Sequence, residues 1–294
     1  MKKILITGRT GFIGRNLKEQ LVTNYEIITP PSNEINLLDS EEVETCLRQN
    51  NFDVIIHCAT WNATRNSNKD LSKILENNLR MYFNLARYQK YYGKMIYYGS
   101  GAEFSREHWK PRMREDYFDI YIPTDQYGFS KYIMCKHAEK SQNIYNLRLF
   151  GVFGRYEDYQ IRFISNAICK VIFELPITIE QNVFFDYLYI DDLIKITRWY
   201  IEHEPDEKIF NICTGSVLDL YTIAQKIFEI SEKKLDIRVC KDDIGREYSG
   251  DNSKLLNEIP DCHFRDINVC IQDLYHWYKN NMNNINSEKL VAGI

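Results

Sequence analysis

A glycine-rich turn near the start of the chain constrains its fold more than any other feature. The run Lys3-Ile4-Leu5-Ile6 predicts a short strand, and apolar residues at helical spacing up to Leu21 predict a helix soon after it. Glycines at the first, fourth and seventh positions of the turn allow a tight bend, close approach of the backbone to a ligand, and close packing of the helix. The turn consists of Gly8, Arg9, Thr10, Gly11, Phe12, Ile13 and Gly14.

The position of this turn distinguishes a phosphate-binding loop from a plain glycine bend. The first N–H groups of a helix have no partners within the helix and carry positive potential, so they suit phosphate oxygens. Here the glycines directly follow a predicted strand and open a predicted helix, which favours a dinucleotide-binding loop. The turn does not end in Gly-Lys-Ser or Gly-Lys-Thr, so a nucleoside triphosphate loop is not expected.

Strand and helix patterns alternate through the first half of the chain. Further short apolar runs predict strands at 25–28, 54–57, 94–98 and 146–150. Helices are predicted to begin near Ser40, Ile74 and Gln126, with Ser40 as the N-cap of its helix. Consecutive βα units imply a parallel sheet, and we therefore expect an α/β fold of the doubly wound Rossmann type.

The alternation loosens after Gly154, which predicts a second, smaller lobe interleaved with the sheet domain. We expect residues 1–154 and about 184–214 to form the dinucleotide-binding domain. The C-terminal substrate lobe then takes about 155–183 and 215–280. Residues 281–294 are polar and weakly patterned, and they are expected to form a frayed tail.

Charge and cysteine usage exclude several classes of protein. The 37 Lys and Arg against 41 Asp and Glu give a net charge of −4, so no nucleic-acid partner is expected. No apolar run approaches the roughly 18 residues of a membrane helix, and the N-terminal sequence does not fit a signal peptide. Eight cysteines without a Cys-x-x-Cys pair, and six histidines without metal spacing, predict reduced thiols, no metal site and a cytoplasmic protein.

A second group of residues is typical of a site for proton transfer. Tyr127 and Lys131 are four residues apart near the start of a predicted helix, so they share one face. An ammonium near a phenol stabilises the phenolate, which suits a group that gives and takes a proton. Tyr-x-x-x-Lys alone is more often a surface pair. Ser100 changes this assessment, because it follows the fourth predicted strand at the sheet edge where such folds bind ligands.

Together these motifs resemble the extended short-chain dehydrogenase/reductases, the NAD-dependent epimerases and dehydratases that modify nucleotide sugars. The resemblance covers about residues 3–280. It also includes Asn78 in the central helix and the segment Phe185-Asp186-Tyr187-Leu188-Tyr189-Ile190-Asp191-Asp192-Leu193.

The resemblance implies an enzyme with a nicotinamide dinucleotide cofactor and a nucleotide-diphosphate sugar as substrate. Ser100, Tyr127 and Lys131 would be catalytic, with Tyr127 transferring the proton, Ser100 hydrogen-bonding the sugar oxygen, and Lys131 holding the nicotinamide ribose. The glycine turn, Tyr127 and Lys131 would bind the cofactor. Asn36, Leu37, Ala59 and Asn78 would contribute to the same site. A role in making a surface polysaccharide sugar is implied in the same way.

Departures from the family pattern narrow the reaction. The 4,6-dehydratases carry Asp-Glu after the strand-end residue, where this chain has Gly101 and Ala102, and Glu103 is displaced by one residue and is expected to point elsewhere. The segment 33–40 resembles that of GDP-fucose synthases, but their epimerising Cys and His are matched by Ala102 and Arg162 or a neighbour. We therefore expect an NAD(P)-dependent oxidoreductase that reduces a keto group, at C4, of a nucleotide-diphosphate sugar.

Two alternatives stay open. A nucleotide-sugar 4-epimerase with tightly bound NAD would use the same serine, tyrosine and lysine. A non-catalytic dinucleotide-binding sensor or scaffold is the alternative from another class, although such proteins typically lose the tyrosine or lysine. The second strand ends without the acidic residue that NAD-specific members use for the ribose, and Arg9 could accommodate a 2′-phosphate. NADP is therefore favoured over NAD.

The substrate side is less defined. The usual Asn and Arg of the family are replaced by Gly151 and Phe185. Arg155, Arg162 and Arg246 are candidate ligands of the diphosphate, because a guanidinium can bind phosphate oxygens in pairs, but each could equally be a surface ion-pair residue. We also expect a homodimer. Its contact could use aromatic residues of the central helix region, for which an internal core is the alternative; these are Tyr82, Tyr88, Tyr91 and Tyr92.

Overall fold

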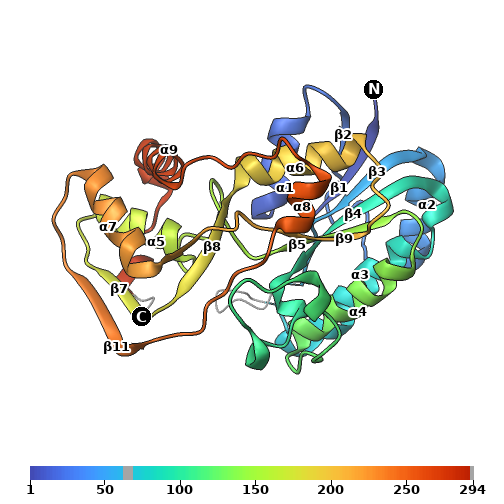
Figure 1. The fold of residues 1–294 in the computed structure, drawn as a ribbon. Coiled ribbons are helices and arrows are strands. Elements are labelled where there is room, and N and C mark those ends of the chain that lie inside the picture. The colour runs from blue at the N-terminus through green and yellow to red at the C-terminus, as the bar shows by residue number, and fades with distance from the viewer. Residues whose placement is uncertain (62–68, 292–294) are drawn as a thin grey trace. The chain divides into compact units, whose positions relative to one another are not determined.

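The computed structural model describes residues 1–61 and 69–291, which divide into two compact units. Unit 1 comprises Met1–Trp109, Arg114–Leu149 and Ile196–Ile212, and unit 2 comprises Lys110–Met113, Phe150–Lys195 and Cys213–Ile294. Figure 1 labels elements of both units.

Unit 1 is built on a six-stranded sheet in the order β2-β1-β3-β4-β5-β9, in which every neighbouring pair is parallel. The strands are β1 (Lys3–Thr7), β2 (Glu26–Ile28), β3 (Phe52–His57), β4 (Tyr92–Ser100), β5 (Ile144–Leu149) and β9 (Ile209–Ile212). The chain adds β2 on one side of β1 and all later strands on the other side. This order confirms the doubly wound Rossmann class, and its switch point lies between the carboxyl ends of β1 and β3.

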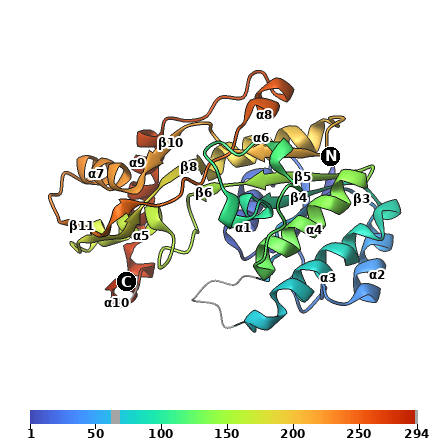
Figure 2. The same ribbon diagram turned by 60° about the horizontal axis from the view of Figure 1, so that its bottom comes forward.

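Both faces of this sheet are covered, which explains why its strands are almost continuously apolar. The helices of unit 1 are α1 (Phe12–Leu21), α2 (Ser40–Asn50), α3 (Ile74–Ala86), α4 (Gln126–Lys140) and the second half of α6 (Ile190–Glu202). Figure 2 shows α2, α3 and α4 side by side. Met95 and Tyr97 of β4 belong to the buried cluster that Tyr82 of α3 also joins. The alternate residue Tyr98 instead hydrogen-bonds Thr197 of α6 at 2.8 Å.

Side-chain caps begin two helices of unit 1, α2 and α4, whereas the N-caps of α1 and α3 form no side-chain cap hydrogen bond. Asp39, rather than the expected Ser40, caps α2, because its carboxylate accepts from the backbone N–H groups of Glu41 and Glu42. Asp125 caps α4 by accepting from the Gly128 N–H at 2.8 Å. The N-cap of α1 is Gly11, which has no side chain to offer.

Short 3-10 turns connect several of these elements. They are η1 (Leu71–Lys73), η2 (Gln89–Tyr91), η3 (Gly101–Glu103), η4 (Arg106–His108), η5 (Glu115–Tyr117) and, near the C-terminus, η6 (Met282–Asn284).

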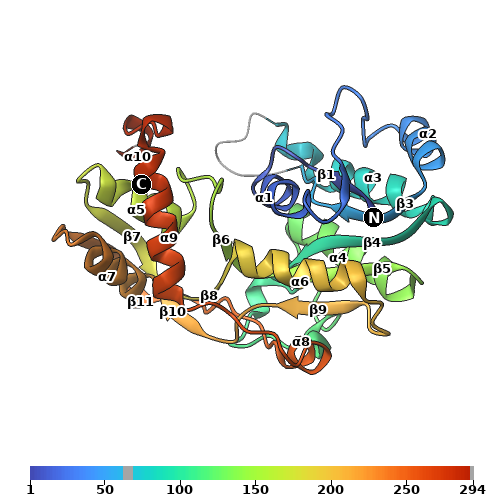
Figure 3. The same ribbon diagram turned by 90° about the horizontal axis from the view of Figure 1, so that it is seen from above.

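Unit 2 contains two small sheets, β10-β8-β6 and β11-β7. Their strands are β6 (Gly151–Phe153), β7 (Ile177–Asn182), β8 (Phe184–Tyr189), β10 (Val217–Asp219) and β11 (Ile237–Ile244). The helices are α5 (Phe163–Ile172), α7 (Leu220–Ser231), α8 (Ser253–Glu258), α9 (Ile267–Asn280) and α10 (Glu288–Val291). Helices α5, α7 and α9 contact one another, and Figure 3 shows this group.

The boundaries of the two units differ from those expected. Residues 184–214 were expected in the dinucleotide-binding domain, but only Ile196–Ile212 lies in unit 1. The reason is that β8 pairs with β6 and β10 of unit 2 rather than with the large sheet. The first segment of unit 1 also ends at Leu149 instead of residue 154, since β6 begins at Gly151.

The expectation of a frayed tail at 281–294 is wrong for the described part of that segment. Residues 288–291 form α10, which contacts α5, and the Leu290 side chain is fully buried. Four residues that include only Leu290 and Val291 as apolar residues are too short a pattern to predict a helix, so tertiary packing decides here. Residues 292–294 lie outside the described part of the chain.

Of the four tyrosines around α3 that were considered for a dimer contact, Tyr88 and Tyr91 are half-buried and pack against the core cluster of unit 1. Tyr82 and Tyr92 are buried inside unit 1, where Tyr82 packs edge-on against Tyr97.

Among the described residues, no helix combines the length and the apolar character needed to cross a membrane.

Candidate active site

The turn from β1 to α1 is built from closely packed backbone. Gly8 has φ +73°, and a Cβ atom there would lie 2.7 Å from the Ala59 backbone nitrogen. A Cβ at Gly14 would overlap the Gly8 carbonyl oxygen, which also accepts from the Gly11 N–H at 3.0 Å. The glycines therefore allow the turn to pack against the chain that follows β3.

This turn fits the phosphates of a dinucleotide. Because Gly11 caps α1 without a side chain, no capping group covers the first N–H groups of the helix. These donors and the positive end of the helix suit a pyrophosphate. Arg9 is half-buried, and Thr10 is exposed on the same turn. The residues present are thus compatible with the cofactor that the motif predicts.

A buried contact joins β1 to β3 beneath this turn. The Thr7 hydroxyl lies 2.8 Å from His57 Nδ1 and accepts from the Ala59 N–H at 3.2 Å. Burial, with a smaller contribution from the Lys131 charge, lowers the pKa of His57 to about 3. His57 is therefore neutral near pH 7, and it acts with Thr7 to hold Ala59 in place.

The predicted cofactor residue Asn78 uses its carboxamide to hold the loop after β3. Its Oδ1 accepts from the Trp61 N–H at 2.7 Å and from the Thr60 hydroxyl at 3.2 Å. Asn78 is almost fully buried, so any effect on a cofactor passes through this loop. The sequence motif indicated the residue but not this role.

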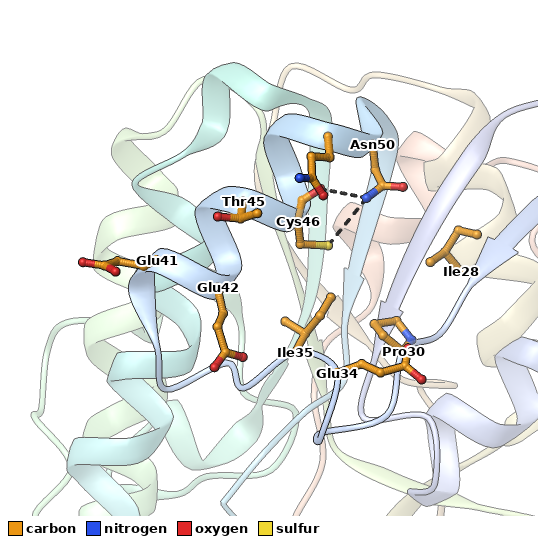
Figure 4. A pocket seen from close by; sticks show the side chains of 10 residues that line it. Ile28, Pro30, Glu34, Ile35, Glu41, Glu42, Thr45, Cys46 and Asn50 are labelled. Carbon is orange, nitrogen blue, oxygen red and sulfur yellow. Dashed lines mark hydrogen bonds between the residues drawn. The ribbon is translucent and has the colours of Figure 1, made fainter.

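Asn36 and Leu37 lie in the loop between β2 and α2, which is fixed at several points. The Asn36 N–H donates to Glu42 at 2.8 Å, and Asn84 donates to the Leu37 carbonyl at 2.9 Å. A pocket borders this loop, and Figure 4 shows Glu34, Glu41 and Glu42 among its lining side chains. Three carboxylates make this pocket unsuitable for a phosphate.

Ser100 ends β4 and caps the turn η3. Its Oγ accepts from the Ala102 N–H at 3.1 Å. Because this contact uses a lone pair, the hydroxyl hydrogen remains for a hydrogen bond to a substrate oxygen.

Tyr127 and Lys131 lie in the first two turns of α4, close to Ser100. A Cβ at Gly128 would lie 2.6 Å from the Ala102 carbonyl oxygen, so only glycine allows α4 to approach η3 this closely. Lys131 is nearly buried and its Nζ donates to the Tyr98 carbonyl at 2.8 Å. The same Nζ lies 5.9 Å from the centre of the Tyr127 ring. Unit 1 therefore brings the three predicted side chains to one end of β4.

Glu103 does point away from these side chains. It is fully buried and forms an ion pair with Arg148, whose Nε lies 2.6 Å from Glu103 Oε2. Gly101 and Ala102 offer no acidic group beside Ser100, so the acid pair of the dehydratases is missing here.

The three predicted substrate arginines all lie in unit 2. Arg155 is half-buried, and its Nη2 lies 3.4 Å from Asp191, which Arg265 also contacts. Arg162 precedes α5 and Arg246 follows β11, and both are exposed. Arg155 thus belongs to an ion-pair network, whereas the side chains of Arg162 and Arg246 lie at the surface.

Unit 2 explains both departures from the family pattern. A Cβ at Gly151 would lie 2.6 Å from the Asp186 carbonyl oxygen, so an Asn there would not fit this backbone. Phe185 stacks on Tyr187 with ring centres 5.4 Å apart. With Tyr189 they line a pocket that Thr214 and Arg265 also border. The sequence reasoning missed this aromatic lining, although its period of two along β8 is the pattern of a strand face.

Comparison with known proteins gives independent evidence on the family of this chain. The profile of the NAD dependent epimerase/dehydratase family matches residues 4–213. The chain is 27% identical to dTDP-4-dehydro-6-deoxyglucose reductase of Escherichia coli, over 79% of this chain and 82% of the relative. It is also 27% identical to GDP-6-deoxy-D-talose 4-dehydrogenase of Aggregatibacter actinomycetemcomitans, over 93% of this chain and 97% of that protein.

A solved structure shares the fold. The GDP-L-fucose synthetase of Naegleria fowleri, bound to NADP, superposes with a TM-score of 0.83 at 15% identity, over 96% of this chain and 94% of that one. The profile match covers more than half of the sequence and includes the glycine turn, Ser100, Tyr127 and Lys131. This chain therefore belongs to the NAD dependent epimerase/dehydratase family, within the extended short-chain dehydrogenase/reductase enzymes.

Proposed function

We propose that this enzyme reduces the C4 keto group of a nucleotide-diphosphate sugar with NADPH. The observation that carries the proposal is the grouping of Ser100, Tyr127 and Lys131 at the end of β4, beside Gly101 and Ala102. This set can protonate a reduced carbonyl but lacks the acids of the elimination reaction. The names of both relatives place their chemistry on carbon 4, which supports the same position here.

The chemistry divides between the cofactor and the protein. A bound dihydronicotinamide supplies a hydride to the keto carbon. Tyr127 donates its hydroxyl proton to the keto oxygen, so that C=O becomes CH–OH, and it regains a proton from solvent. Ser100 donates a hydrogen bond to the same oxygen and stabilises the negative charge that develops there.

Lys131 prepares Tyr127 for this step. Its ammonium is held by the Tyr98 carbonyl, so it keeps its place 5.9 Å from the centre of the Tyr127 ring. A fixed positive charge stabilises the phenolate left after proton transfer. The remaining N–H donors of Lys131 would hold the ribose of the cofactor.

NADP is the preferred coenzyme in this proposal. The strand β2 ends at Ile28, and Thr29 and Pro30 follow, so the strand end itself carries no acidic residue to bind the ribose as in NAD-specific members; the carboxylates of Glu34 and Glu42 belong to the pocket beyond it. Arg9 on the glycine turn is the candidate ligand for that phosphate. In unit 2, Arg162 and Arg246 are the candidates for the substrate diphosphate, while Arg155 is shared with Asp191.

The decisive experiment offers a panel of 4-keto nucleotide-diphosphate sugars with NADPH or NADH and follows coenzyme oxidation. We expect oxidation with at least one sugar, faster with NADPH, and a product hydroxyl at C4 by NMR. Interconversion of a 4-hydroxy sugar without added coenzyme would instead identify a 4-epimerase with retained NAD. Tight coenzyme binding with no turnover of any sugar would favour the sensor.

We also propose that the protein forms a homodimer through α3 and α4. Half-buried apolar side chains recur at four-residue spacing on α3 (Leu75, Leu79 and Phe83) and on α4 (Phe129 and Ile133). These neighbouring stripes suit packing against the same helices of a second copy. Sedimentation should give twice the chain mass, and Leu79→Glu should give a monomer. A wild-type monomer at micromolar concentration would refute this contact.

A further inference from the structure

A buried carboxylate lies directly behind Ser100, and the proposed reaction does not use it. Glu103 is fully buried. Both of its carboxylate oxygens accept hydrogen bonds. Oε1 accepts from the Ser100 N–H at 3.1 Å, and Asn146 Nδ2 donates to Oε1 and Oε2 at 3.1 and 3.0 Å. Arg148 Nε completes the set on Oε2.

The counter-charge is equally buried and equally well bound. Arg148 donates to Asn211 Oδ1 at 3.1 Å and to Cys135 Sγ at 3.3 Å. Its guanidinium also lies over the rings of Phe104 and Phe118, at 4.5 and 5.1 Å. A buried ion pair is weak evidence for stability alone, because apolar side chains of similar volume often serve as well. Stability alone therefore does not account for this pair.

The sequence also makes room for this carboxylate. A Cβ at Gly99 would overlap Glu103 Oε1 and Asn146 Oδ1, so the residue before Ser100 must be glycine for the cluster to form. Asn146 and Arg148 lie on β5, and Asn211 lies on β9. Through Glu103, the side chains of Asn146 and Arg148 therefore tie Ser100 to β5, and Asn211 of β9 supports Arg148.

Glu103 and Ser100 form a reciprocal cap. The Glu103 carboxylate holds the Ser100 N–H, and the Ser100 Oγ accepts from the Ala102 N–H. The backbone of Ser100 is thus fixed, and a lone pair of its hydroxyl is used. The O–H hydrogen is left to point away from the cluster, which makes Ser100 a donor to a substrate oxygen rather than an acceptor.

We propose that Glu103 is a positioning residue that holds Ser100 as a hydrogen-bond donor to the reacting oxygen. This inference rests on the proposed reductase function. In this proposal Glu103 acts through Ser100 and touches no substrate, whereas the acids of the dehydratases take part in the elimination itself.

A double-mutant cycle tests the proposal. Glu103→Gln keeps the shape of the side chain, but its NH₂ group would face the N–H donors that now bind one of the two carboxylate oxygens. We therefore expect kcat to fall about tenfold, with KM and the coenzyme Kd within about twofold of the wild-type values. In a Ser100→Ala background, Glu103→Gln should then cause less than about a twofold further loss. A full tenfold loss in that background would overturn the proposal, because a merely structural role lowers activity whether or not Ser100 is present.

Two further variants keep the test decisive. Glu103→Asp retains the charge for Arg148 but withdraws it from Ser100, and it should give the same non-additive loss even if Glu103→Gln folds poorly. Asn211→Ala removes a partner of Arg148 on a different strand, so it should lower the melting temperature while kcat changes less than about twofold. A fall in kcat with Asn211→Ala as large as that with Glu103→Asp would contradict positioning.

A measurement without substrate separates this proposal from the reductase proposal. Amide hydrogen exchange at Ser100 should accelerate at least about tenfold in Glu103→Gln and Glu103→Asp, but not in Asn211→Ala. If the wild-type protein reduces no sugar, the reductase proposal fails, and unchanged exchange at Ser100 would still refute the role of Glu103. Accelerated exchange with additive kinetic losses would refute positioning while leaving the reductase function intact.

Discussion

The candidate site residues of the two units are held in different ways. In unit 1 the groups are anchored to backbone, since Lys131 donates to the Tyr98 carbonyl and Ser100 accepts from the Ala102 N–H. In unit 2, Arg155 shares Asp191 with Arg265, and Arg162 lies at the surface. The difference teaches that a site built at strand ends is specified by local sequence, whereas arginine positions depend on loops and their ion-pair partners.

The prediction with the largest expected effect concerns the hydroxyl group of Tyr127 in unit 1. Tyr127→Phe should lower kcat at least about a hundredfold, or about 2.7 kcal/mol of transition-state stabilisation, because the proton donor is lost. Steady-state turnover of the keto sugar that the wild type reduces measures this loss. The exposed Tyr121 offers a matched control, since Tyr121→Phe should retain near-normal turnover. Similar rates for Tyr127→Phe and wild type would remove Tyr127 from the mechanism.

The same contrast explains which parts of the molecule could be read from sequence. The alternation of strands and helices defined the sheet of unit 1, because buried parallel strands and amphipathic helices leave strong periodic signals. Ser100, Tyr127 and Lys131 could be grouped from sequence because parallel strands end at a common edge. The contact of Gly128 with Ala102, which brings them together, could not be seen, since it depends on the approach of two backbones.

Other features lay beyond local pattern. The pairing of β8 with β6 and β10 is a long-range choice, and it moved residues 184–195 out of the expected domain. Gly151 looked like a missing functional residue, yet the Asp186 carbonyl leaves no room for a side chain there. The buried pair of Glu103 and Arg148 was also hidden, because a charged residue gives no sequence signal of burial.

The C-terminal segment offers a test of unit 2, where periodicity failed and packing decides. Leu290 is fully buried in α10, so Leu290→Ala should lower the free energy of unfolding by about 2 kcal/mol. Urea denaturation followed by circular dichroism measures the change. Met282, which is 41% exposed, offers the control, and Met282→Ala should be nearly neutral. Equal stabilities for Leu290→Ala and wild type would show that α10 contributes no packing.

Two substitutions in the glycine turn separate two requirements for glycine there: close packing of the backbone, and close approach of the cofactor. Gly8→Ala should lower the melting temperature and raise the Kd of NADPH about tenfold, because φ is +73° and the new Cβ would meet Ala59. Gly11 has an ordinary φ of −76°, and its Cβ would lie 3.3 Å from the Gly8 oxygen.

Gly11→Ala should therefore lower the melting temperature less than Gly8→Ala does while still weakening NADPH binding about tenfold, since a methyl group would meet the pyrophosphate. Fluorescence titration and thermal unfolding of both variants provide the comparison. Unimpaired NADPH binding by Gly11→Ala would mean that the pyrophosphate does not approach this turn.

A pH-dependent test concerns a carboxyl group in the loop of unit 2 that carries Arg155 and Arg162. Burial raises the pKa of Glu157 to about 8, although a hydrogen bond from Ser165 and the Arg162 charge act in the opposite direction. The folded chain therefore binds more protons than the unfolded chain between the ordinary pKa of 4.5 and about 8. Stability from this group is fully present below the lower value and is lost as pH rises through the upper one, by at most about 1.4 kcal/mol per pH unit.

Glu157→Gln should remove this slope, because the amide keeps an oxygen for Ser165 but carries no titrating proton. We expect the difference in unfolding free energy between variant and wild type to shift in favour of the variant from pH 5 to pH 8. The exposed Glu229 on α7 offers the control, and Glu229→Gln should leave the wild-type slope unchanged. Parallel pH profiles for wild type and Glu157→Gln would show that Glu157 is ionised in the folded chain. The loop that carries Arg155 and Arg162 would then be hydrated like a surface segment, and its contrast with the buried end of β4 in unit 1 would be sharper than the structure indicates.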